Sequence, residues 1–379
     1  MKVILALVLV ALSQTETFAV KADNCPDFEV VCYYASWAIY RPSPASLNVT
    51  EINPNLCTHL IYAFAGLDVY AHIGSIDSWA DLNQGGLSGF TALKEKNPCL
   101  RTSLAIGGWN EGSLKYSVMA NEPDIREEFI TSTIKFLAYY NFDGIDVDWE
   151  YPTQRGGRNF DKENFVTLIR ELKEKLSKWG MTVTIAVPIT DNFIDEAYDV
   201  PELNKYIDAV HLMAYDYVTS ASEATGLNAP LSKIKNSIKE WLDRGLDDKK
   251  LILGLPLYAR RFKLKDAKNH DLGADAEPGP VSQFTGEIGY LAYYELEFMK
   301  NESYIEKLED DTLYAYYKDD WLTYDNITTY STKVKYALNN NLGGVMVWTL
   351  DTDNFIEGSF EVLEGINKHI NETNKIVKV

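Results

Sequence analysis

The chain has 379 residues, 46% of them hydrophobic, and carries a formal net charge of −19 with a pI near 4.7. This length can bury one large core or two small ones, and it also fits a single α/β barrel of roughly 250 residues with an insertion. The acidic charge argues against nucleic acid or an anionic membrane surface as a partner. Since the acids are spread along the chain, solubility is their simplest explanation.

Residues 1–19 have the pattern of a secretory signal peptide. Lys2 precedes the apolar run VILALVLVAL, and Thr17 and Ala19 supply small residues at the cleavage site. The run is too short to span a bilayer, and no later window of about 20 apolar residues follows. We therefore predict a secreted, extracellular protein that does not engage a membrane, and we expect a monomer.

An oxidising compartment makes the four cysteines candidates for disulfides: Cys25, Cys32, Cys57 and Cys99. Four cysteines allow three sets of pairings, and their spacing does not choose among them. Secretion also fits the four Asn-X-Ser/Thr sites, which are candidates for glycosylation: Asn48, Asn301, Asn326 and Asn371.

Eight short apolar runs recur along the mature chain, at 28–34, 58–65, 101–108, 142–150, 181–188, 207–216, 250–258 and 343–350. Continuous apolar runs are typical of strands buried on both faces, as in a parallel sheet. Helical periodicity occupies 121–141, 161–180, 232–245 and 331–344, between such runs. The alternation predicts an α/β protein with a (β/α)8 TIM barrel.

The interval from 258 to 343 is about twice as long as the other strand-to-strand intervals. It contains the segments GPVSQFTGEIGYLAYYELEFM and TLYAYYKDDWLTYDN, which are rich in strand-forming aromatic residues and turn residues. We predict a small α+β insertion domain at about 262–330, between strands 7 and 8, within a single catalytic domain that spans 20–379.

The fourth run, FDGIDVDWEYP at 142–152, places Asp146, Asp148 and Glu150 at alternate positions. Alternate residues of a strand share one face and lie roughly 6.5 to 7 Å apart. The apolar residues between the acids then pack against helices, while the acids point into the barrel. Glu150 comes last, nearest the carboxyl end of the barrel, where such folds hold their active sites. Asp143 has the opposite parity and is expected to brace the strand.

Three alternatives compete with a catalytic role for these acids. A solvated edge strand conflicts with the bulky apolar residues between them, and a calcium loop would need Gly at Tyr151 and Glu at Gly157. The third is a buried structural network. Against it, like charges this close in a barrel cannot all stay ionised, so at least one acid holds a proton near neutral pH. A protonated carboxyl at a barrel mouth is what general-acid cleavage of a glycosidic bond requires.

The segment FDGIDVDWEYP resembles the signature of glycoside hydrolase family 18, the chitinases and chitinase-like lectins. Other segments resemble further blocks of that family in its order: VCYYASWAIYRP, CTHLIYAFAG, LAIGGWN, LMAYD, LILGLPLYARRF, LAYYE and GGVMVWTLD. The resemblance covers nearly the whole mature chain and is closest to animal chitinases with the insertion domain. It implies retaining hydrolysis of β-1,4-linked N-acetylglucosamine polymers or oligomers, with chitin or chitooligosaccharide as partner, and with no metal or organic cofactor.

The family lacks the usual carboxylate nucleophile. By resemblance, Glu150 protonates the glycosidic oxygen, and the acetamido oxygen of the substrate attacks the anomeric carbon. Asp148 then binds the acetamido N–H and stabilises positive charge, while Asp146 shares or relays a proton. Tyr215 orients the acetamido oxygen.

The resemblance also implies a sugar-binding groove floored by Trp348. Its predicted members are Tyr33, Trp37, Phe64, Trp79, Gly107, Gly108, Trp109, Asn110, Tyr151, Met213, Ala214, Asp216, Tyr258, Arg260 and Trp348. Trp149 is left in the layer between barrel and helices by its parity, and His211 receives no role.

Some features depart from the family pattern. MAYDYVTSASEATG lacks the Trp that family members often carry after MAYD, which weakens the expected leaving-group subsite. Cys32 and Cys57 match a family disulfide between the first two strands, and Cys25 and Cys99 are left as an additional bridge. A second family pair is missing. We expect no separate chitin-binding module, because no Cys-rich segment follows the barrel.

Two functional classes remain from the sequence. The first is an active secreted chitinase, most simply endo-acting, because Glu150 is present together with Asp146, Asp148 and Tyr215. The second is a catalytically weak or inactive chitinase-like lectin that binds chitooligosaccharides, since fold alone does not decide function. A third hypothesis keeps the same hydrolytic reaction but takes chitooligosaccharides or N-glycan cores as the substrate instead of the polymer.

Overall fold

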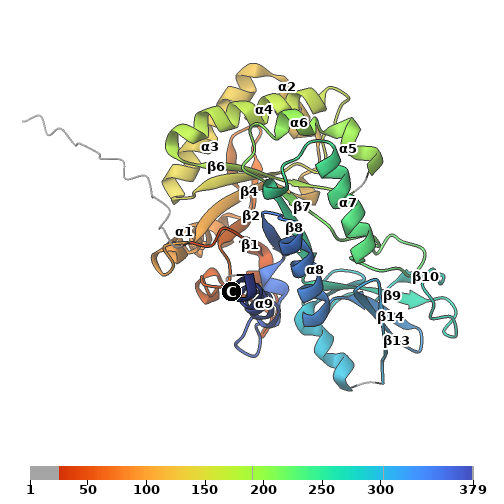
Figure 1. Cartoon of the computed structure of the whole chain (residues 1–379). Helices are drawn as coiled ribbons and strands as arrows, with labels where there is room; N and C mark the ends of the chain where they lie inside the picture. Colours follow the sequence, from red (N-terminus) through yellow and green to blue (C-terminus); the bar gives the residue numbers. More distant parts are fainter. Residues whose placement is uncertain (1–24, 190, 302, 378–379) are drawn as a thin grey trace, which may run out of the picture.

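The structure, a computed structural model, describes residues 25–189, 191–301 and 303–377, so the predicted signal peptide lies outside the described residues. Its main body is a closed parallel barrel (Figure 1). Around the barrel, the eight strands are β1 (Glu29–Ala35), β2 (His59–Leu67), β4 (Arg101–Gly107), β5 (Gly144–Asp148), β6 (Thr182–Val187), β7 (Ala209–Leu212), β8 (Leu251–Pro256) and β15 (Gly344–Trp348). The barrel closes because β1 pairs in parallel with both β2 and β15. This confirms the predicted (β/α)8 TIM barrel.

The barrel strands are buried along nearly their whole length, which is why they appear in the sequence as continuous apolar runs. Helices surround them (Figure 1). They are α1 (Gly86–Ala92), α2 (Leu114–Asn121), α3 (Pro123–Tyr140), α4 (Asp161–Leu176), α5 (Asp191–Ala197), α6 (Val200–Leu203), α7 (Leu231–Asp243), α8 (Ile327–Asn339) and α9 (Glu361–Val377). In the part of the chain that the structure describes, no helix combines the length and the apolar character needed to cross a membrane.

A second, antiparallel sheet follows β8. It contains β9 (Tyr258–Leu264), β10 (Ala276–Pro278), β11 (Tyr290–Ala292), β12 (Ile305–Glu309), β13 (Thr312–Tyr317) and β14 (Asp320–Tyr324). The sheet begins at Tyr258, a few residues before the expected boundary at 262, because the chain passes from β8 into β9 with only Leu257 between them. It ends before 330, since the Asn326 side chain caps α8 by accepting from the backbone N–H groups of Thr328 and Thr329.

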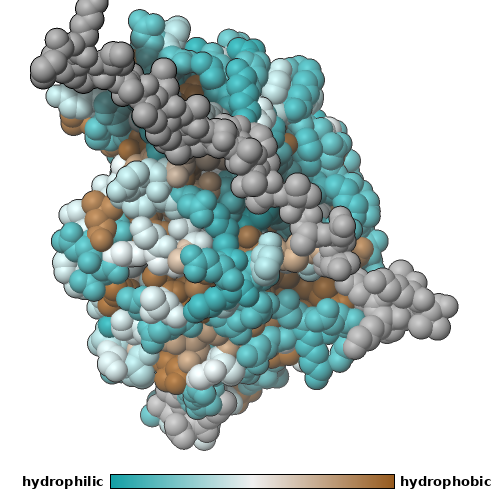
Figure 2. All heavy atoms as spheres, turned by 90° about the vertical axis from the view of Figure 1, so that its left-hand side faces the viewer, coloured by the Kyte–Doolittle hydropathy of each residue, from teal (hydrophilic) through white to brown (hydrophobic). Residues whose placement is uncertain are grey.

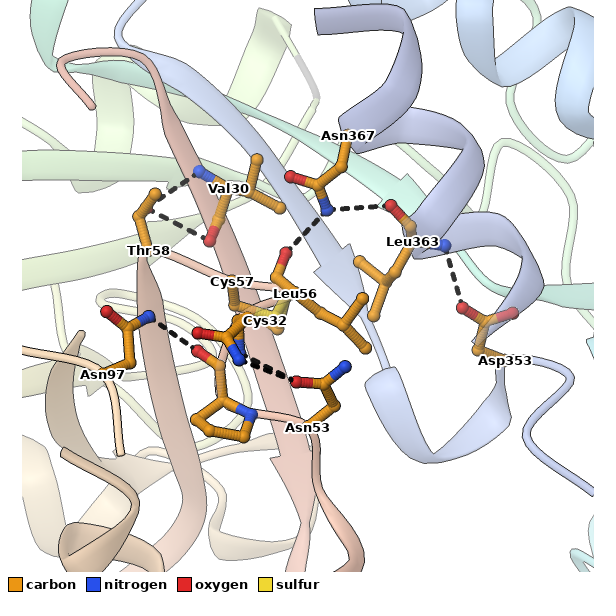
Figure 3. Close-up of a disulfide and its surroundings, with 12 residues drawn as sticks. Val30, Cys32, Asn53, Leu56, Cys57, Thr58, Asn97, Asp353, Leu363 and Asn367 are labelled. Carbon is orange, nitrogen blue, oxygen red and sulfur yellow. Dashed lines mark hydrogen bonds between the residues drawn. A yellow bond between two sulfur atoms is a disulfide. The ribbon is translucent and has the colours of Figure 1, made fainter. Parts of the chain in front are cut away.

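Two disulfides join Cys32 to Cys57 and Cys25 to Cys99, the pairings that were expected. The first ties β1 to the loop that precedes β2 (Figure 3). In the same region the Asn367 side chain of α9 donates hydrogen bonds to the carbonyls of Leu56 and Leu363, both at 2.8 Å. The disulfide loop is therefore also held by the last helix.

Several elements were not among those expected from the sequence: the short helices α1, α2, α5 and α6, the strand β3 (Ile73–Ser75) and the helix α9. Strand β3 pairs antiparallel with the end of β2, so that β2 and β3 form a hairpin at the edge of the barrel. Helix α9 follows the last barrel strand and packs against α8. Its first turn is capped by Asp353, whose carboxylate accepts from the N–H groups of Val362 and Leu363, each at 2.9 Å.

Candidate active site

The acids of β5 take the faces predicted from their parity. Asp146 contacts side chains of three other barrel strands, which places it inside the barrel. Trp149 is buried on the opposite side, where its ring lies 6.0 Å from Tyr116 of α2 and 5.7 Å from Phe165 of α4. Asp143 braces the strand as expected, since it pairs with Lys94 at 2.8 Å. Glu150 lies two residues beyond the end of β5.

Asp146 is fully buried and bound from three sides. Tyr33 of β1 and Thr184 of β6 each donate a hydrogen bond of 2.5 Å, and His211 Nδ1 of β7 lies 3.0 Å from Asp146 Oδ1. Burial acts to raise the pKa of Asp146, but His211 and the hydrogen bonds outweigh it and lower that pKa below its usual value. Asp146 is therefore the ionised member of the set.

Asp148 and Glu150 have the opposite tendency. Burial, followed by the charges of Glu150 and Asp146, raises the pKa of Asp148 well above its usual value. Its Oδ1 atom is buried and has no hydrogen-bond partner among the described residues. Burial raises the pKa of Glu150 to about 7, although a hydrogen bond with Tyr151 and the charge of Arg155 act in the other direction. The three acids therefore differ in protonation near neutral pH. Asp146 is ionised, Asp148 is protonated, and Glu150 titrates near neutrality.

The end of β4 fixes the backbone beside these acids. The N–H of Gly108 donates to the carbonyl of Asp148 at 2.8 Å. A Cβ at Gly107 would lie only 2.1 Å from that carbonyl oxygen, and its φ of +114° is one that side chains rarely permit. Only glycine fits at this position.

Asp216 stands at the centre of a second cluster of predicted residues. Its carboxylate accepts from Tyr258 at 2.7 Å and from two guanidinium nitrogens of Arg260 at 2.8 and 2.6 Å. Its neighbour Tyr215 is buried, and burial followed by the charge of Asp148 raises the pKa of Tyr215. The Tyr215 hydroxyl therefore keeps its proton and remains a hydrogen-bond donor.

Aromatic rings gather at the carboxyl ends of β1, β2 and β15. The Trp348 ring lies 5.8 Å from Phe64, 6.3 Å from Trp37 and 5.5 Å from Tyr33. Trp37 is 40% exposed, whereas Tyr33 and Phe64 are buried. Flat rings that are partly exposed offer an apolar surface to a ligand.

Trp109 is the most exposed of the predicted aromatic residues, at 60%. The Arg155 guanidinium lies over its ring at 3.5 Å, and the same side chain donates to the carbonyls of Trp109 and Glu150 at 2.8 and 3.0 Å. Arg155 thereby joins the backbone of the candidate acid to an exposed aromatic platform.

The structure does not bring every predicted residue into these clusters. The Trp79 ring contacts Tyr40 at 5.2 Å rather than the rings around Trp348. Tyr33, Ala214 and Tyr258 are buried, so Tyr33 and Tyr258 act on the carboxylates. Asn110 lies in the turn Trp109–Glu111, and Met213 directly follows β7. Tyr151 lies beside Phe193, with ring centroids 5.3 Å apart.

Three residues that sequence reasoning missed support the site: His211, Arg155 and Asn228. Asn228 Oδ1 accepts from the backbone N–H of Asp216 at 3.1 Å. His211 carried one usable signal, because it is the polar residue of the apolar strand AVHL. No group of three or more His, Cys, Asp or Glu side chains suited to a metal ion occurs among the described residues.

Comparison with known proteins places this geometry in a family. The family model for glycosyl hydrolases family 18 matches residues 29–353. Probable chitinase 2 of Drosophila melanogaster is 39% identical over 378 residues, which cover 93% of this chain and 78% of that protein. The structure of Ostrinia furnacalis Group IV chitinase in complex with allosamidin has a TM-score of 0.89 at 37% identity, covering 91% of this chain and 99% of that one.

An inactive relative has the same fold. Human YKL-39, described as a pseudo-chitinase with retained chitooligosaccharide binding, has a TM-score of 0.83 at 30% identity, covering 91% of this chain and 100% of that one. The match of the family model over most of the chain and the identity with the Drosophila protein agree with the fold and with the acid-bearing strand. This chain belongs to glycosyl hydrolase family 18.

Proposed function

We propose that the protein is a secreted chitinase that cleaves β-1,4-linked N-acetylglucosamine polymers or oligomers with retention. The observation that carries the proposal is the protonation of Glu150. Its carboxyl lies just past the end of a barrel strand, and burial raises its pKa to about 7. A general acid works best when its pKa lies near the operating pH. In this proposal Glu150 protonates the glycosidic oxygen as the bond to the anomeric carbon breaks.

The nucleophile in this proposal is the acetamido oxygen of the substrate. It attacks the anomeric carbon, the leaving sugar takes the proton of Glu150, and an oxazolinium ion forms. Asp148 passes its proton to the ionised Asp146, so that negative charge develops beside the new cation. The unpartnered Oδ1 of Asp148 is then free to accept the acetamido N–H. Ionised Glu150 finally removes a proton from the water that opens the intermediate.

The surrounding residues bind and orient the sugar. Tyr215 donates its hydroxyl proton to the acetamido oxygen, and Trp348 lies beneath the sugar at the cleaved bond. Trp37 extends this surface, with the buried ring of Phe64 stacked against it, and Trp109 supplies a further exposed ring. Asp216 is held by Tyr258 and Arg260, which keeps it in place to bind the distorted sugar. We propose an endo mode of attack, in which the exposed rings of Trp37 and Trp109 extend the binding surface beyond the sugars at the cleaved bond.

The alternative is a lectin that binds chitooligosaccharides without cleaving them, like the pseudo-chitinase human YKL-39, which retains chitooligosaccharide binding. Two observations favour the enzyme. The proton donor is present as Glu150, and the three acids differ in protonation as substrate-assisted cleavage requires. In addition, Asp148 lies at the carboxyl end of a barrel strand and its Oδ1 has no partner among the described residues, which leaves an acceptor for the substrate.

The test is hydrolysis of a chitooligosaccharide by the purified protein beside Glu150→Gln. We expect the wild type to cleave it and the variant to lose about 10²- to 10⁴-fold in kcat, the usual contribution of a general acid. Glu295→Gln is the matched control, because Glu295 is also buried with a raised pKa but lies in the second sheet region. Binding without cleavage by the wild type would establish the lectin. Full activity of Glu150→Gln would remove the role of Glu150.

A further inference from the structure

Helix α3 carries a second stripe of residues beside the one that faces the core. Its core stripe contains Phe129, Ile130 and Leu137. The second stripe is spaced by three and four residues and runs along one side of the helix through Glu128, Ser132, Phe136, Tyr139 and Tyr140. Solvent-facing sides of helices normally carry charged and polar residues. This stripe ends in aromatic rings: Phe136 and Tyr140 are partly buried and pack against the core, whereas Tyr139 is 81% exposed.

The β2–β3 hairpin forms a second wall beside this stripe. The backbone N–H of Ile73 donates to Ser132 Oγ at 3.2 Å, and His72 Nε2 lies 2.8 Å from Glu128 Oε1. Between hairpin and helix lies an open pocket of about 490 Å³. Sites for small ligands occupy roughly 300 to 1,000 Å³. Figure 2 shows the side of the molecule on which α3 lies in Figure 1, with small apolar groups scattered over a largely hydrophilic face.

The lining of the pocket suits a neutral ligand with flat apolar faces. The Tyr140 ring lies 4.8 Å from both Phe136 and Tyr139, and the Tyr139 and Tyr140 rings stand at 82° to each other. The lining carries one carboxylate, that of Glu128, which is already bonded to His72, and one ammonium, that of Lys135, together with the hydroxyl groups of Ser132, Tyr139 and Tyr140. No excess of either charge remains in the lining to select an acidic or basic partner. A pyranose offers apolar C–H faces to the rings and hydroxyl or acetamido groups to the polar side chains.

The pocket is also connected to the proposed sugar-binding surface through the chain. The segment that leaves β3 carries Asp77 and Trp79. Tyr40 donates to Asp77 at 2.7 Å and contacts the Trp79 ring. The same hairpin therefore contributes His72 to the pocket and leads to Trp79, which contacts Tyr40 at the end of the short turn Ser36–Tyr40 that also carries Trp37.

We infer that the pocket between α3 and the β2–β3 hairpin is a second binding site for an N-acetylglucosamine chain, outside the barrel. The inference rests on the proposed function for the identity of the sugar. Solid chitin presents many parallel chains, so a second contact would hold the protein on the solid through an increased effective concentration. A short soluble oligomer can occupy only one site at a time.

The experiment measures binding to insoluble chitin in the Glu150→Gln background, where the solid is not degraded. Tyr139→Ala is expected to weaken binding about fivefold, the order expected for loss of one aromatic contact. Because Tyr139 is largely exposed, its truncation leaves the core intact, and the thermal midpoint confirms folding. Trp179→Ala is the matched control: Trp179 is an aromatic residue that is 50% exposed and lies in neither site. It is expected to bind like the parent.

Equal binding by Tyr139→Ala and the parent would overturn the inference, whatever the hydrolytic activity. An equal loss of chitin binding in Trp179→Ala would also overturn the inference, because any exposed aromatic residue would then contribute to binding on the solid. Hydrolysis of a soluble trisaccharide by the protein with native Glu150 reports on the barrel site alone. If Tyr139→Ala weakens binding to solid chitin but the protein with native Glu150 cleaves no trisaccharide, the second binding site is supported and the proposed function is contradicted.

Discussion

The end of β5 and the loop before α9 each bury a carboxyl group whose pKa is raised, and they use it differently. At the end of β5, burial raises the pKa of Glu150 to about 7 and that of Asp148 well above its usual value. In the loop before α9, burial raises the pKa of Asp353 to about 7. The surroundings differ, however. Asp353 accepts from the N–H groups of Asn354, Val362 and Leu363.

Asp148 Oδ1 has no such partner among the described residues. A buried acceptor without a partner costs free energy, about 1 to 3 kcal/mol. An unpartnered acceptor at the carboxyl end of a barrel can accept a hydrogen bond from a ligand. The oxygens of Asp353, in contrast, already accept hydrogen bonds from the first turn of α9. A shifted pKa alone therefore does not identify a catalytic acid. Unused hydrogen-bonding capacity separates the two regions.

The largest difference is expected from Asp148→Asn. The amide keeps the shape but cannot become negative when the oxazolinium ion forms. We expect kcat to fall about 10²- to 10³-fold, as for loss of one electrostatic stabiliser. We also expect the thermal midpoint to stay at or above the wild-type value, because a buried ionisable group beside two other acids has been replaced by a neutral amide. Steady-state kinetics and a melting curve measure both. A large fall in the thermal midpoint would make Asp148 a structural acid like Asp353.

A second difference concerns how stability changes with pH. The folded-state pKa of Glu150 lies above its usual 4.5, so its favourable contribution exists below pH 4.5 and is lost as pH rises through about 7. Glu150→Gln removes this loss. We expect the variant to be more stable than the wild type at pH 8, by up to about 3 kcal/mol, and equal to it near pH 4. Denaturant unfolding at the two pH values provides the measurement, and a pH-independent difference would contradict the assignment.

The smallest effect on turnover is expected from Asp353→Ala. The N–H groups at the start of α9 lose their acceptors, so the free energy of unfolding is expected to fall by about 1 to 2 kcal/mol. Turnover per folded molecule is expected to stay at the wild-type value, because Asp353 touches none of the residues around Glu150. Loss of turnover in correctly folded Asp353→Ala would erase the contrast between the two regions.

The sequence predicted local features well. The apolar runs located the eight barrel strands, and the parity of FDGIDVDWEYP placed Asp146 and Trp149 on opposite faces because side-chain direction in a strand depends only on position. Helix α9 was missed, since no strand follows it to complete an expected repeat. The second sheet begins at Tyr258, before the predicted 262, because only Leu257 separates it from β8, the seventh strand of the barrel.

Contacts between distant segments could not be predicted. His211 lies 65 residues after Asp146 and reaches it because only β6 separates β7 from β5 in the barrel. Arg155 lies in a loop without periodicity, so nothing in its spacing indicated that it would cover Trp109. Trp79 was grouped with the groove, yet its ring partner is Tyr40, because β3 directs that segment along the edge of the barrel. The pocket on α3 likewise depends on the hairpin that packs beside it.

The central claim is that Glu150 donates the proton to the departing sugar. The most direct measurement compares kcat/KM of the wild type and Glu150→Gln on two substrates, a chitooligosaccharide and the nitrophenyl glycoside of N-acetylglucosamine oligomers. A nitrophenolate leaves without protonation, whereas a sugar alkoxide does not. We predict that the variant loses at least about tenfold more on the oligosaccharide than on the nitrophenyl glycoside. Equal losses on both substrates would contradict the account.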